Sequence, residues 1–180
     1  MKTKTLETIQ KLSRLGKVLS KIVFIFSLIG AIGCAAGFVS MALLPESFQL
    51  GSVTIQGLVD LTDEVNPNEV YSAMAVGMIT FTAEAILAKL AERYFHRELE
   101  AGTPFTFAGA KELKRLGVCA IVIPIAALVA AEIVHNLMQQ FLTGIGSLDL
   151  AESGSVGLGI MMIVASLLCK YGAELTQPGE

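Results

Sequence analysis

Residues 115–142 read RLGVCAIVIPIAALVAAEIVHNLMQQFL, a long and largely apolar stretch. It is uncharged from Leu116 to Ala131 and then continues without a break into a more polar segment. At a rise of ~1.5 Å per residue, an α-helix of this length crosses the ~30 Å hydrocarbon core of a bilayer. The stretch therefore predicts a membrane-spanning helix that carries polar side chains below the membrane surface. These side chains are Glu132, His135, Asn136 and Gln139.

The composition of the whole chain is typical of a membrane protein. The chain has 180 residues, which fits a single domain over residues 1–180, and its mean hydropathy is +0.66. It is 53% hydrophobic and 16% charged, whereas soluble domains carry about 25% charged residues. The three cysteines have no Cys-x-x-Cys spacing, so we expect free, buried thiols rather than a disulfide or a zinc site. They are Cys34, Cys119 and Cys169.

Four apolar segments predict an all-α, integral membrane four-helix bundle. The predicted spans are residues 22–45, 70–94, 115–142 and 153–174. The second span is the least regular, because Glu84 interrupts it, and an interfacial helix is the alternative. Pro124 predicts a kink or a local irregularity in the third span, since proline removes a backbone donor.

The N-terminal segment, residues 2–21, is basic and has helical periodicity. It holds six Lys or Arg residues against the single acid Glu7, and aliphatic residues recur every three or four positions. Such a segment predicts a basic amphipathic N-terminal helix that lies on an anionic membrane surface before the chain turns inward. The alternative is a plain extension of the first span.

The thirteen basic residues predict how the chain is threaded. Six lie in the N-terminal segment, six lie between Lys89 and Arg115, and the last is Lys170. The connectors at residues 46–69 and 143–152 hold acidic residues and no Lys or Arg. Under the positive-inside rule, both termini and the middle connector face the cytoplasm, and the two acidic connectors face outward.

Local signals predict features beside the spans. The β-branched residues of segment 52–61 favour a short hairpin or strand in the first acidic connector. Thr106 is the expected N-cap of a helix that leads into the third span. The small residues Gly30, Gly33 and Gly37 favour close approach of another helix, which we expect within the chain rather than across a dimer.

Two charged side chains fall inside predicted spans, where each needs a partner. Glu84 follows Val70 by fourteen residues, and Lys170 follows Gly154 by sixteen, so the depths are about 21 and 24 Å. These matching depths predict a structural ion pair between the second and fourth helices. The alternatives are that Lys170 reaches the cytoplasmic surface while Glu84 is protonated, or that the carboxylate serves a proton or ion relay.

The polar stripe of the third span is the preferred binding candidate. Glu132 and His135 have the Glu-x-x-His spacing of di-iron bundles, but such a site needs two motifs and two further carboxylates. We therefore expect no metal and no cofactor. We expect instead an outward-facing polar pocket that Tyr71, Ser72 and Thr80 of the second helix help to form, in which His135 reports external pH.

Three stretches carry a resemblance to a known family. They are Gly102 to Thr106 (GTPFT), Lys111 to Gly117 (KELKRLG) and Lys170 to Leu175 (KYGAEL). These motifs resemble those of a family of bacterial four-span membrane proteins known as domain of unknown function 2975. The resemblance implies four helices in a cytoplasmic membrane and supplies no catalytic residues. Members are often described as neighbours of small helix-turn-helix regulators, which implies a regulatory role.

These observations favour a non-enzymatic, multi-pass protein of the bacterial cytoplasmic membrane that acts as a regulatory or sensing partner. Its expected partners are the lipid bilayer, a protein bound through the cytoplasmic basic surface, and a second copy of the chain. Nucleic acid is not expected, because the basic segment suits anionic lipid better. The first alternative is a small oligomeric transporter or channel that uses Glu84, Glu132 and His135, and a membrane enzyme comes third.

Overall fold

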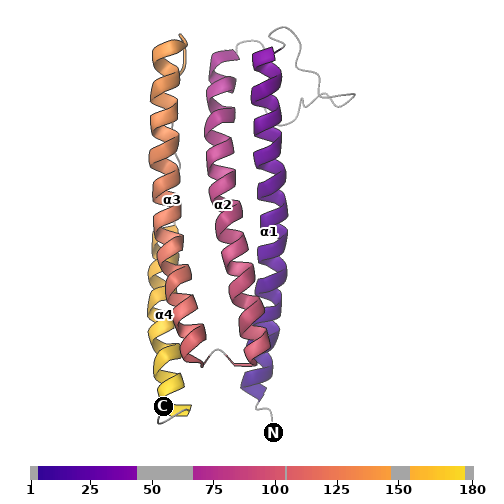
Figure 1. Ribbon diagram of the computed structural model, residues 1–180, viewed down its shortest axis with the longest axis vertical. Helices are drawn as coiled ribbons and strands as arrows, with labels where there is room; N and C mark the ends of the chain where they lie inside the picture. Colours follow the sequence, from indigo (N-terminus) through magenta and orange to yellow (C-terminus); the bar gives the residue numbers. More distant parts are fainter. Residues whose placement is uncertain (1–3, 44–66, 104, 147–154, 177–180) are drawn as a thin grey trace. The chain divides into compact units, whose positions relative to one another are not determined.

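The structure, a computed structural model, describes residues 4–43, 67–103, 105–146 and 155–176. These residues form four α-helices and no strand: α1 (Lys4–Leu43), α2 (Pro67–Ala101), α3 (Phe107–Phe141) and α4 (Ser155–Thr176) (Figure 1). The predicted all-α four-helix fold is thereby confirmed. The hairpin or strand predicted for residues 52–61 lies outside the described residues.

Each of the four helices is long and apolar enough to cross a membrane. At ~1.5 Å per residue, the 22 residues of α4 measure about 33 Å, close to the ~30 Å of a hydrocarbon core. The 40 residues of α1 measure about 60 Å, and α2 and α3 have 35 residues each. These three helices are therefore longer than the thickness of a bilayer's hydrocarbon core. α3 also continues through Pro124 as a single helix.

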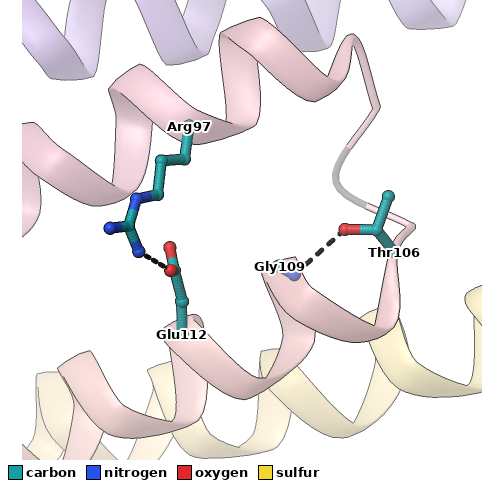
Figure 2. Close-up of polar contacts among 4 residues, drawn as sticks. All are labelled: Arg97, Thr106, Gly109 and Glu112. Carbon is teal, nitrogen blue, oxygen red and sulfur yellow. Dashed lines mark hydrogen bonds and ion pairs between the residues drawn. The ribbon is translucent and has the colours of Figure 1, made fainter.

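The described ends of α2 and α3 follow from local chemistry. After α2, Gly102 adopts φ +75° and its N–H donates to the Glu98 carbonyl at 3.0 Å, which closes the helix in the left-handed way that glycine favours. Before α3, the Thr106 hydroxyl accepts a hydrogen bond from the Gly109 N–H at 3.0 Å (Figure 2). The predicted N-cap is therefore confirmed. The helix that it begins, α3, also contains most of the predicted third span.

The chain divides into two compact units, and the division cuts across three helices. The first unit comprises Met1–Ser27, Ala83–Ala126 and Glu152–Glu180, and the second comprises Leu28–Thr82 and Ala127–Ala151. α1, α2 and α3 therefore contribute to both units, whereas α4 belongs entirely to the first. The first unit holds the charged portions of α1, α2 and α3, together with the first part of the apolar stretch of α3.

The first unit has its own apolar core at the charged ends of α2 and α3. Tyr94, Leu113 and Leu116 are buried there, with exposed fractions of 8% or less. Residues of α2 and α4 pack around them: Leu90, Ala91, Phe95, Met162, Ala165 and Cys169. The charged segments are thus a packed module rather than solvated tails.

The N-terminal segment packs along α2 as the first half of α1. The buried Ser13 hydroxyl donates to Glu98 Oε1 at 2.8 Å, and the Gln10 side-chain amide donates to the Gly102 carbonyl at 2.9 Å. Gly16 faces Phe95 so closely that a Cβ would lie 2.7 Å from the ring. α1 runs from Lys4 to Leu43 without a break. The predicted basic N-terminal helix is therefore present, and it continues into the first apolar segment as one helix.

Within the first unit, α3 and α4 approach each other at a pair of glycines. A Cβ added to Gly159 would lie 2.8 Å from the Gly117 carbonyl oxygen and 2.4 Å from Cγ1 of Ile121. A Cβ added to Gly117 would in turn lie 2.8 Å from the Gly159 carbonyl oxygen. Two backbones can approach this closely only where neither residue carries a side chain. At the other end of α4, Gly172 lies against the Phe105 ring.

Within the second unit, α1 packs on α2 through small residues and one aromatic pair. A Cβ on Gly30 would lie 3.0 Å from the Phe81 ring, so this glycine serves packing within the chain, as predicted. Phe38 and Tyr71 stack with ring centroids 4.2 Å apart. These contacts fix α1 beside the part of α2 that carries the polar residues described next.

Candidate functional site

A buried polar cluster occupies the second unit, where α2 meets the end of α3. Ser72 is 2% exposed and His135 is 5% exposed, and the Ser72 hydroxyl lies 2.8 Å from Nδ1 of His135. Nε2 of His135 lies 3.1 Å from the Gly146 carbonyl oxygen. Both ring nitrogens of His135 therefore have a polar neighbour within the second unit.

The imidazole of His135 is surrounded by polar groups of the chain. Nε2 has two neighbours at 3.1 Å, the Gly146 carbonyl oxygen, which accepts, and the side-chain amide nitrogen of Gln139, which donates. The same Gln139 amide donates to the Gly146 carbonyl at 3.1 Å. The hydrogen-bonding groups of the imidazole therefore all have partners within the chain.

The loop that follows α3 folds back on the first turn of α2. Gly144 adopts φ +80°, a left-handed conformation that glycine reaches without strain. The Asn68 side-chain amide donates to the Thr143 carbonyl at 2.9 Å. A Cβ added to Gly146 would lie 3.2 Å from Oε1 of Glu69, so this glycine lies close to the first turn of α2. The loop is therefore held against α2, and the Gly146 carbonyl of the loop contacts the polar side chains of His135 and Gln139 of α3.

The predicted supporting residues of α2 take three different roles. Ser72 meets His135 as expected. Tyr71 instead stacks on Phe38, and the Thr80 hydroxyl donates to the Gly77 carbonyl of its own helix at 3.1 Å. Ser72 is therefore the member of the expected set that reaches the polar stripe of α3.

The predicted stripe of α3 divides between two faces of the helix. His135 is buried, and Gln139 is exposed but donates to the loop. Glu132 and Asn136 are exposed on the surface of the chain. In the described part of the chain, no group of three or more His, Cys, Asp or Glu side chains gathers around the Glu-x-x-His pair. The structure thus gives a closed polar cluster on one face and two exposed polar residues on the other.

The two charged residues predicted to pair have other partners. In the first unit, the buried Ser27 hydroxyl donates to Glu84 Oε2 at 3.3 Å. Lys170 lies 3.8 Å from Glu174 Oε1, one helical turn further along α4. Among the described residues, Glu84 and Lys170 form no ion pair with each other, so this part of the prediction is wrong. Their similar depths were counted from the predicted starts of the spans, which do not determine the rotation or the axial position of α4.

A basic cleft in the first unit was not predicted. It lies between the end of α2 and the start of α3 and has a volume of about 140 Å³. Two of its lining residues, Arg97 and Glu112, form an ion pair (Figure 2). The spacing of Arg93 and Arg97, one helical turn apart, indicates a shared face of α2. The lining residues are Leu90, Arg93, Tyr94, Arg97, Glu112, Arg115, Leu116 and Cys119.

Comparisons of the chain with protein-family models, with curated proteins and with solved structures found no match. The functional argument therefore rests on the two sites described above and on the four apolar helices.

Proposed function

We propose that the protein is a multi-pass component of the bacterial cytoplasmic membrane, related to the domain of unknown function 2975 family, and that it acts as a non-enzymatic regulatory or sensing partner. In this proposal both termini and the connector between α2 and α3 face the cytoplasm. The charged end of the first unit binds a partner protein there, through exposed basic residues of α3 such as Lys111 and Lys114.

One observation carries the proposal. The charged ends of α2 and α3 pack with α4 around a common apolar core, and the Ser13–Glu98 hydrogen bond ties the N-terminal segment of α1 to α2. A chain that needed only to anchor itself in a bilayer would require no such module beyond its apolar segments. A folded, largely basic surface next to a membrane suits a protein that presents a docking face.

The second unit supplies a candidate sensing element for the same function. His135 and Ser72 are buried, and their cluster adjoins the loop after α3, which the threading places on the outer side. The transporter alternative gains no specific support. Both ring nitrogens of His135 already have partners within the chain.

The threading predicts the position of reporter tags. A tag inserted after Leu150 is expected to be accessible from outside the cytoplasmic membrane, because the acidic connectors carry no Lys or Arg. Tags at either terminus are expected to be accessible only after the membrane is permeabilised. Protease accessibility in spheroplasts measures both. A tag after Leu150 that is protected until permeabilisation would contradict the threading.

The partner is tested by photo-crosslinking from single positions on α3. A photoreactive residue at the exposed position Lys114 is expected to give a discrete protein adduct in native membranes. The matched control is Val122, which lies two turns further along the same helix and is also exposed but apolar, so it is expected to contact lipid. Failure to obtain a protein adduct from Lys114, or the same adduct from both positions, would refute the docking role of this surface.

A further inference from the structure

We propose that the basic cleft of the first unit binds a phosphate group, and that the phosphate belongs to the headgroup of an anionic phospholipid. This goes beyond the proposed function but uses its threading, which places the cleft at the cytoplasmic edge of the bilayer. The cleft is formed by the end of α2 and the start of α3, and all of its lining residues lie in the first unit.

The charge of the lining favours an anion. Three arginines and one glutamate line the cleft, so the formal charge of its lining is +2 (three minus one). Glu112 is engaged by Arg97, while among the described residues no ion pair forms with Arg93 or Arg115. The nearby carboxylate of Glu92 pairs with Lys89 at 2.7 Å. Two guanidinium groups therefore remain to receive a ligand.

The shape and chemistry of the lining favour phosphate over a larger or purely apolar ligand. Guanidinium groups present paired N–H donors that match phosphate oxygens. The apolar side of the cleft is formed by Leu90, Leu116 and Cys119. Its volume of about 140 Å³ is below the roughly 300–1,000 Å³ of sites that enclose drug-sized molecules. A phospholipid could place its headgroup phosphate in a cleft of this volume while its acyl chains stay outside.

The position of the cleft along the helices favours a lipid as the source of that phosphate. Arg115 immediately precedes the uncharged run that begins at Leu116, and Arg93 follows the apolar part of α2. The cleft therefore lies where both helices change from apolar to charged. In a bilayer this border lies at the level of the lipid phosphates, and basic pockets between helices on the cytoplasmic side bind anionic headgroups.

The test compares two double variants of the full-length chain by native mass spectrometry in detergent. Arg93→Gln/Arg115→Gln removes two charges from the cleft and leaves the Arg97–Glu112 pair in place. Lys111→Gln/Lys114→Gln removes two charges from exposed positions of α3 outside the lining. Each protein is titrated with short-chain phosphatidylglycerol, with phosphatidylcholine and with inorganic phosphate. Far-UV circular dichroism and size-exclusion profiles establish that both variants are folded.

Phosphatidylglycerol is expected to bind the unmodified chain and the lysine variant alike, and to bind the arginine variant at least about tenfold more weakly. Equal affinity of all three proteins would overturn the site. Binding of inorganic phosphate alone with the same arginine dependence would overturn the lipid as the source. These measurements use purified protein, so a failed partner crosslink or an inverted tag position leaves them interpretable.

Discussion

Gly159→Ala is expected to destabilise the protein by roughly 1–3 kcal/mol, although alanine is the better helix former. The added methyl group would lie 2.8 Å from the Gly117 carbonyl oxygen and 2.4 Å from Cγ1 of Ile121. The side chain of Ile121 can rotate, but the carbonyl belongs to the backbone of α3. The two helices must therefore move apart, and the contacts that surround the crossing weaken with them.

Gly157→Ala is the matched control for this substitution. Gly157 lies on the same helix, and a Cβ there would meet no atom within 4 Å. Alanine should therefore be neutral at this position, or stabilising by up to about 1 kcal/mol through its helix propensity. Thermal unfolding in detergent, followed by circular dichroism at the helical band, measures both variants. The same sign of change in the two would show that α4 does not cross α3 at Gly117.

His135→Ala is expected to lower the free energy of unfolding by roughly 1–3 kcal/mol, the cost of leaving buried polar groups unsatisfied. The substitution removes the ring nitrogens that contact the Ser72 hydroxyl and the Gly146 carbonyl. Asn136→Ala, one residue further along the same helix at an exposed position, should change stability by less than about 0.5 kcal/mol.

A double-mutant cycle with Ser72→Ala separates the hydrogen bond from the packing of the ring. If the two side chains interact as described, the loss in the double variant should be smaller than the sum of the two single losses, by about 0.5–3 kcal/mol. Additive losses would mean that the imidazole contributes volume alone. The cycle uses unfolding in the same detergent as the glycine variants, so the two sets of values are comparable.

The features that could be predicted from the sequence depend on near neighbours along the chain. The N-cap at Thr106 is an interaction with a residue three positions away, and the four apolar helices follow from composition over about 20 residues. Each of these features depends only on residues of one segment, so it can be predicted without knowing how the other helices pack.

The features that were missed depend on how separate helices are rotated and shifted against each other. Glu84 and Lys170 have similar nominal depths, but α4 is positioned by Gly159 on Gly117 and by Gly172 on Phe105. The basic cleft needs one face of α2 and one face of α3 to meet. The N-terminal segment has a periodicity that suits a membrane surface and a helical partner equally well, and its contacts with α2 could not be read from that periodicity.

The hydrogen bonds between the N-terminal segment and α2 can form only after most of the first hundred residues have been synthesised. Gln10 and Ser13 bond to residues 92 and 85 positions later in the chain. Because a ribosome releases the chain from its first residue, the segment emerges long before its hydrogen-bond partners exist. A nascent chain arrested before residue 98 therefore lacks both residues to which Gln10 and Ser13 bond, so this face of its basic helix is left without its native neighbour.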